Sequence, residues 1–198
     1  MRIIDNFFKD PYTIRKLALS RQFLYNIDDN SWPGIRSEIE EPYRSIYSNQ
    51  YKKFFDESVE LLYMYFQSID KSYCEGTVHF DDCKYTVITY LNLDIPSNSG
   101  TEVYDVCGYS SRKECVLDLQ KFNQRTKVDF NRSNRTLVEQ FFYKKKLKKF
   151  NFKFKDPCVV SNRFNRTLIF NGERFHRAQN FFGTTLSNSR LTLVSFYK

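Results

Sequence analysis

The segment "GTVHFDD", residues 76–82, places a histidine and an aspartate two positions apart, at His79 and Asp81. Side chains alternate between the two faces of a β-strand, so on an extended chain these two point to the same side. An imidazole and a carboxylate on one face are two of the ligands that a non-haem iron(II) site uses. The pair alone also suits a polar strand end, so a third ligand is needed to decide.

The second of the chain's two histidines is the candidate third ligand. His176 lies in "IFNGERFHRAQNFFG" (169–183), just after a predicted strand and a turn at Asn171 and Gly172. Taken alone, it is more simply a half-buried polar residue at a strand edge. Two imidazoles and one carboxylate on one face of an octahedron leave three positions for other ligands, so the three residues together predict an iron(II) centre.

The sequence around these residues is typical of β-strands from residue 72 onward. Five segments are rich in β-branched and aromatic residues and are separated by turn signals. They are "SYCEGTVHF" (72–80), "KYTVITYLNL" (84–93), "TEVYDV" (101–106), "RTLIFN" (166–171) and "RLTLVSFY" (190–197). The series predicts an antiparallel sheet, interrupted at about 106–157 by a charged, partly helical insertion.

The part before residue 70 is predicted to be helical. Asp10 is a candidate N-cap with Pro11 at the first helical position. After a loop at "SWPGIRSEI" (31–39), apolar residues at near-helical spacing predict a long amphipathic helix across 43–69. The predicted fold class is therefore α+β, with N-terminal helices packed on a β-sandwich or jelly roll. We expect one domain over 1–198, with core strands at about 72–105 and 158–198.

Composition limits the class of protein. Of the 198 residues 41% are hydrophobic and 18% aromatic, which is ample apolar mass for a folded core. No apolar run approaches the roughly 20 residues that span a bilayer, and the N-terminus lacks the apolar core of a signal peptide. The five cysteines form no C-x-x-C pair, which argues against a zinc ribbon and favours reduced thiols. These features predict a cytoplasmic protein with no membrane partner.

Much of the net charge of +8 lies in one basic run, "YKKKLKKFNFKFK" (143–155). Such a run is usually a solvated surface. Clustered lysines also supply the sequence-independent attraction to phosphates, so a nucleic acid bound through Lys144 to Lys155 stays an alternative.

The ordered segments resemble a known family. "VHFDD", "YTVITYLN", "SGTEVYD", "LIFNGERFHRA" and "SRLTLVSFY" look like successive core strands of the iron(II)/2-oxoglutarate-dependent dioxygenases, in the prolyl-4-hydroxylase-like branch. The match covers about 77–104 and 166–197, and small bacterial and phage members are most similar. The resemblance implies a double-stranded β-helix (jelly roll) core. Two departures are Ser99-Gly100 in place of the usual Gly-Gly, and a longer gap between His176 and Arg190.

The resemblance also implies the roles of individual residues. The implied iron ligands are His79, Asp81 and His176. Arg190 matches the arginine that holds the far carboxylate of 2-oxoglutarate, a task suited to a planar guanidinium. Thr192 lies two residues on, on the same strand face, and Tyr90 matches a tyrosine that bonds the same carboxylate. Either residue could instead simply be part of the core.

The implied reaction is the hydroxylation of a C–H bond, with O2 and 2-oxoglutarate consumed and succinate and carbon dioxide released. Ascorbate is an expected auxiliary reductant. A peptide or protein side chain is the favoured substrate; a nucleobase, or a non-catalytic binding module, is the alternative. The loop "WPGIR" offers Trp32 and Arg36 as substrate contacts, although both could equally pack against the sheet.

Overall fold

The computed structural model describes residues 1–25, 33–73, 75–105, 111–126 and 137–198. The helices are α1 (Pro11–Ser20), α2 (Tyr43–Lys52), α3 (Arg112–Thr126) and α4 (Leu137–Asn151). The strands are β1 (Arg2–Ile4), β2 (Leu24–Tyr25), β3 (Ile35–Glu38), β4 (Leu61–Ile69), β5 (Tyr85–Tyr90), β6 (Thr101–Tyr104), β7 (Cys158–Val160), β8 (Thr167–Asn171), β9 (Phe175–Ala178) and β10 (Arg190–Tyr197).

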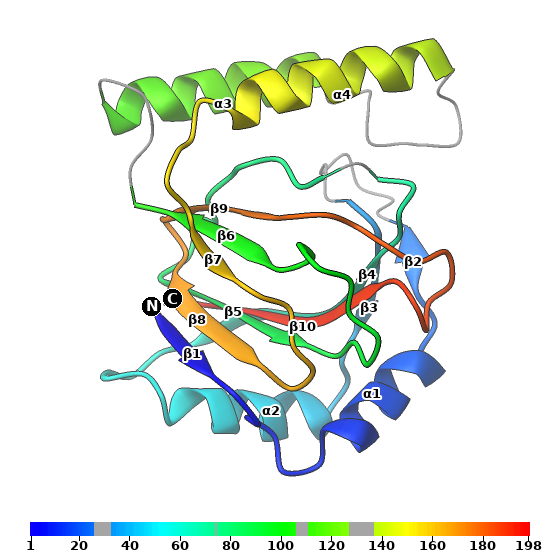
Figure 1. Ribbon diagram of the computed structural model, residues 1–198. Helices are drawn as coiled ribbons and strands as arrows, with labels where there is room; N and C mark the ends of the chain where they lie inside the picture. Colours follow the sequence, from blue (N-terminus) through cyan, green and yellow to red (C-terminus); the bar gives the residue numbers. More distant parts are fainter. Residues whose placement is uncertain (26–32, 74, 106–110, 127–136) are drawn as a thin grey trace.

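The strands form two antiparallel sheets. The larger has the order β1-β8-β5-β10-β4-β3-β2 and the smaller the order β7-β6-β9. Figure 1 shows the small sheet above the large one, with α1 and α2 below the large sheet and α3 and α4 above the small sheet. Each sheet therefore has its outer face covered by two helices, and its inner face is turned toward the other sheet.

Strand β10 shows how alternation separates the core from the site. Leu191, Leu193 and Tyr197 are fully buried and belong to the apolar cluster that includes residues of α1 and α2. The side chains of Arg190, Val194 and Phe196 face the other way and line a pocket. Because successive strand residues point to opposite faces, one strand supplies both the helix-packing core and a wall of the pocket.

Helices α3 and α4 share an apolar cluster with the small sheet, which includes Leu119, Phe150 and Phe175. The rings of Phe122 and Phe150 stack between the two helices with centroids 4.6 Å apart, and Phe154, just after α4, lies 5.3 Å from the Phe175 ring of β9. Both helices lie within the stretch 106–157, where the sequence predicts a partly helical insertion.

The predicted helix across 43–69 is wrong in its second half. Helix α2 ends at Lys52, and Leu61–Ile69 is β4, paired with β10 and β3 inside the large sheet. Residues 64–69 are all buried, so both faces of this part of the strand are covered by protein. A short apolar run buried on both sides has no alternation, and periodicity alone cannot separate it from a buried helix. The described residues before residue 70 therefore contribute β1 to β4 as well as α1 and α2.

The segment 72–80 was predicted to be a strand, but its described residues form only isolated bridges, Glu75 to Asn180 and His79 to His176. Gly76 explains the close approach to β9, because a Cβ atom there would lie 2.7 Å from the carbonyl oxygen of Ala178.

The predicted N-cap of α1 is confirmed. The carboxylate of Asp10 accepts a hydrogen bond of 3.1 Å from the amide of Thr13, so it caps α1 as expected. Cys83, Cys115 and Cys158 are free thiols. Among the described helices, none combines the length and the apolar composition needed to cross a bilayer.

Candidate metal centre

The backbone brings the two histidines face to face. His79 and His176 form an antiparallel bridge, with N to O distances of 3.0 and 2.8 Å in the two directions. Residues opposite each other in such a bridge project their side chains to the same face. The amide of Asp81 bonds the carbonyl of Gly172 at 2.8 Å, which holds the third residue beside them.

The ligand atoms of the three side chains converge. Nε2 of His176 lies 3.3 Å from Oδ2 of Asp81, and Nε2 of His79 lies 3.8 Å from Oδ1 of Asp81. One ligand atom from each residue can be chosen so that all lie within 4.8 Å of one another. Neighbouring ligands of an octahedral ion with bonds of about 2.1 Å are about 3 Å apart, so small side-chain shifts would close these atoms around a metal.

A hydrogen bond at Nδ1 orients each imidazole ring. Nδ1 of His79 lies 2.8 Å from the carbonyl oxygen of Thr77, and Nδ1 of His176 lies 2.9 Å from that of Arg174. A carbonyl only accepts, so each Nδ1 must donate, and Nε2 is the ring nitrogen left to face Asp81 and bind a metal. This is the arrangement by which proteins orient metal-binding histidines.

The charge state of the cluster also suits a cation. Burial by itself would raise the pKa of Asp81, but His176, His79 and the hydroxyl of Thr86 lower it to about 2. Burial, followed by the charge of His176, lowers the pKa of His79 to about 4. Asp81 is therefore an anion and His79 neutral at pH 7, the forms in which they bind metals.

One oxygen of Asp81 is left without a donor. Oδ2 accepts a hydrogen bond of 2.6 Å from the Thr86 hydroxyl, whereas Oδ1 is buried and has no hydrogen-bond partner. Burying an anionic oxygen without a partner is costly, and a metal ion would satisfy it. The donor set and this oxygen together fit a divalent metal.

A second buried polar group surrounds Arg190. Arg190 is 3% exposed; one of its terminal nitrogens donates to the Thr101 hydroxyl at 3.3 Å, and its guanidinium carbon lies 5.5 Å from the ring centroid of Tyr90. The Tyr90 hydroxyl bonds Thr101 at 2.7 Å. Nε of Arg190 and the hydroxyl of Thr192 are buried and have no hydrogen-bond partner. Burial lowers the pKa of Arg190, yet an arginine stays charged.

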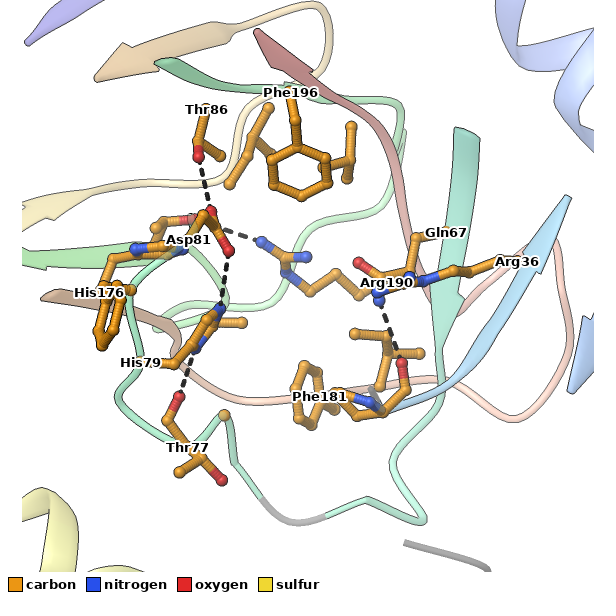
Figure 2. Close-up of a pocket in the computed structure, with 18 of the residues that line it drawn as sticks. Arg36, Gln67, Thr77, His79, Asp81, Thr86, His176, Phe181, Arg190 and Phe196 are labelled. Carbon is orange, nitrogen blue, oxygen red and sulfur yellow. Dashed lines mark hydrogen bonds and ion pairs between the residues drawn. The ribbon is translucent and has the colours of Figure 1, made fainter. Parts of the chain in front are cut away.

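The metal cluster, Arg190 and Thr101 line one pocket of about 310 Å³, whereas Tyr90 and Thr192 do not line it. Figure 2 shows His79, Asp81 and His176 on one side of it and Arg36 and Gln67 on the other. The guanidinium carbon of Arg36 lies 4.1 Å from the ring centroid of Tyr65. The structure thus places Arg36 in the pocket wall, while Trp32 lies outside the described residues.

Sequence reasoning missed two hydroxyl residues of the site. Thr86 bonds Asp81, and Thr101 bonds both Tyr90 and Arg190. Thr86 lies four residues before Tyr90 on β5, so the two share a strand face. This alternation could have placed Thr86 on the same side of the strand as Tyr90. Thr101 lies on the other sheet, and nothing local in the sequence indicates that it meets Arg190.

Comparison with solved structures defines the class of fold. An oxidoreductase of the 2OG-Fe(II) oxygenase family from Burkholderia pseudomallei is 11% identical, with a TM-score of 0.56 over 99% of this chain and 82% of that chain. HygX from Streptomyces hygroscopicus, with nickel, 2-oxoglutarate and hygromycin B bound, is 13% identical, with a TM-score of 0.58 over 98% and 81%. A prolyl hydroxylase from Trichoplax adhaerens, in complex with a hypoxia inducible factor peptide fragment, is 14% identical, with a TM-score of 0.54 over 99% and 82%.

The chain therefore has the fold of the 2OG-Fe(II) oxygenases, and its His79, Asp81 and His176 side chains form a candidate metal site within that fold. It belongs to the family described as "Family of unknown function (DUF6445)", whose model matches residues 1–197. None of the curated proteins compared with the chain matches it.

Proposed function

We propose that this protein is an iron(II)- and 2-oxoglutarate-dependent dioxygenase with a jelly-roll core, which hydroxylates a C–H bond of a peptide side chain. The observation that carries the proposal is the buried charge of Arg190, which is unpaired in the part of the chain that the structure describes. Its guanidinium is buried, lines the same pocket as the metal cluster, and has no carboxylate within ion-pair distance among the described residues. A buried cation without an anion is costly, so the pocket favours an anionic ligand.

In this proposal His79, Asp81 and His176 hold iron(II), and Arg190 holds the far carboxylate of 2-oxoglutarate. The Thr192 hydroxyl, which is buried without a partner, is a further donor to that carboxylate. Tyr90 contributes through its bond to Thr101 and its ring beside the guanidinium. When bound, iron(II) and 2-oxoglutarate supply the activation of O2 and the oxidative decarboxylation that yields succinate and carbon dioxide.

The chain's own residues keep the site ready for that chemistry. The Nδ1 bonds hold both Nε2 atoms toward Asp81, and Thr86 fixes one carboxylate oxygen. Apolar side chains such as Ile88, Val194 and Phe196 line the pocket and limit water. No protein acid or base is assigned, and ascorbate is expected to sustain turnover.

Arg36 is our proposed contact to the prime substrate. It lies in the pocket wall across from the metal cluster, and the Tyr65 ring beneath its guanidinium restricts the orientation of that plane. A fixed guanidinium can donate to the carbonyl oxygens of a peptide backbone. The likeness to a prolyl hydroxylase with a peptide bound supports a peptide substrate.

The test of the proposed activity is the conversion of 2-oxoglutarate to succinate by purified protein with iron(II) and ascorbate, followed by mass spectrometry. We expect slow, iron-dependent succinate formation without prime substrate, and its loss in His176→Ala. Unchanged formation in that variant, or none from iron-loaded wild type, would contradict the proposal. For the substrate, peptides that gain one oxygen are identified by mass, and Arg36→Gln should raise the KM for them more than the KM for 2-oxoglutarate.

A further inference from the structure

Exposed phenylalanines gather on α4 and the turn after it. Phe141, Phe142 and Phe152 are 55%, 56% and 77% exposed, and they are the only exposed phenylalanines among residues whose side chains the structure describes. Val138, one helical turn earlier, is 62% exposed. Single exposed apolar residues are ordinary, but a cluster of them marks an interaction surface.

Lysines surround these rings on the same helix. The exposed lysines of α4 are Lys144, Lys145, Lys146, Lys148 and Lys149. None of them forms an ion pair with any residue in the described ranges. Their positive charge is therefore available to an outside partner.

The helix presents both residue types on one side. Tyr143, Leu147 and Phe150 are buried and turn the opposite side of α4 toward the protein. We call the solvent side, formed by Val138, Phe141, Phe142, Lys145 and Lys149, the outer face of α4. On this face Nζ of Lys145 lies 4.9 Å from the ring centroid of Phe141, so cation and ring already share one surface.

The mixture of rings and cations on the outer face distinguishes between two kinds of anionic partner. A helix that lies on a membrane separates its apolar and cationic side chains onto two faces, with the apolar face in the lipid. Helix α4 uses its apolar side chains at Leu147 and Phe150 against the protein, and its outer face mixes rings with cations. Single-stranded nucleic acid offers phosphates to the lysines and flat bases to the rings.

We propose that the outer face of α4 binds single-stranded nucleic acid, with Lys145 and Lys149 at phosphates and Phe141 and Phe142 stacked on bases. The net charge of +8 favours a polyanion over a neutral partner. This binding does not depend on the iron site, so it stands or fails apart from the proposed oxygenase activity.

The test is fluorescence anisotropy of a labelled oligothymidylate of about 15 nucleotides, titrated with the full chain between about 50 and 200 mM salt. We expect binding whose logarithmic salt slope is about −0.7 for each phosphate contact. Lys145→Gln/Lys149→Gln should make that slope shallower by about 1.4. Lys52→Gln/Lys53→Gln is the matched control, because it removes the same charge from exposed residues at the end of α2, on the opposite side of the molecule in Figure 1.

The rings are tested separately. Phe141→Ala/Phe142→Ala should weaken binding at least about fivefold, whereas Tyr63→Ala, which removes a ring that is 67% exposed on β4, should leave it unchanged. No binding at low salt, or equal binding by the variants and their controls, overturns the proposal. Binding to phosphatidylserine vesicles that survives excess oligothymidylate would assign the face to a membrane and also overturn it.

Discussion

Nε2 of His176 lies 3.3 Å from Oδ2 of Asp81, although one residue is on β9 and the other follows an irregular segment before β5. The backbone bridge between His79 and His176 creates this proximity, because it sets the register of the two segments. The candidate metal site thus depends on this bridge and on the bond from the Asp81 amide to the Gly172 carbonyl, and its hydrogen-bonded surroundings are directly testable.

Thr86 should tune metal affinity through Asp81. Thr86→Val removes the hydroxyl that bonds Oδ2 at 2.6 Å, and loss of such an outer partner typically lowers metal affinity about 10–100-fold. The measurement is calorimetric titration of metal-free protein with Mn(II). Thr89→Val is the matched control: Thr89 is buried on the same strand, but its hydroxyl bonds Tyr51 and Thr167 instead. Equal losses of affinity in both variants would show that Thr86 acts only through stability.

Metal should stabilise the folded chain. A ligand at about 100 times its Kd adds about 2.7 kcal/mol to the free energy of unfolding, which for a chain of this size raises Tm by roughly 5–10 °C. Thermal melting with Mn(II), and again after a chelator, measures the shift. Asp81→Asn should lose it, because the anionic ligand is gone; a full shift in that variant would place the metal elsewhere.

Arg190 should bind 2-oxoglutarate by geometry as well as charge. Arg190→Lys keeps the cation but loses the planar fork, and the loss of a charge-assisted hydrogen bond predicts about 10–100-fold weaker 2-oxoglutarate binding to the metal-loaded protein. The control is Arg163→Lys, an arginine whose partner is Asp5 at the surface. Unchanged affinity in Arg190→Lys would remove the arginine from the proposed site.

The two faces of β10 should separate stability from binding. Leu193 is fully buried in the cluster shared with α1 and α2, so Leu193→Ala should lower the free energy of unfolding by about 2–5 kcal/mol. Its effect on 2-oxoglutarate affinity should be small, because the side chain points away from the pocket. Urea denaturation and calorimetry measure the two quantities. A loss of affinity without a loss of stability would reverse the assigned faces.

Much of the sheet could be predicted from the sequence. The segments 84–93, 101–106, 166–171 and 190–197 contain β5, β6, β8 and β10, because turn residues bound short runs of β-branched and aromatic residues. β4 could not be recognised in this way, since both of its faces are buried and its apolar residues do not alternate.

The part of the candidate site that depends on short sequence spacing was predictable. His79 and Asp81 are two positions apart, and His176 is the chain's other histidine. Thr101 was not predictable, because its contact with Arg190 depends on how the small sheet lies over the large one. Stacking of sheets is a long-range property, and single segments do not encode it.

The most direct test of the central claim is an anomalous-difference map from a crystal grown anaerobically with Mn(II) and 2-oxoglutarate. The account predicts one metal peak bonded by Nε2 of His79, Nε2 of His176 and a carboxylate oxygen of Asp81, with the far carboxylate of 2-oxoglutarate on Arg190. A metal peak away from these three side chains, or 2-oxoglutarate bound without contact to Arg190, would contradict it.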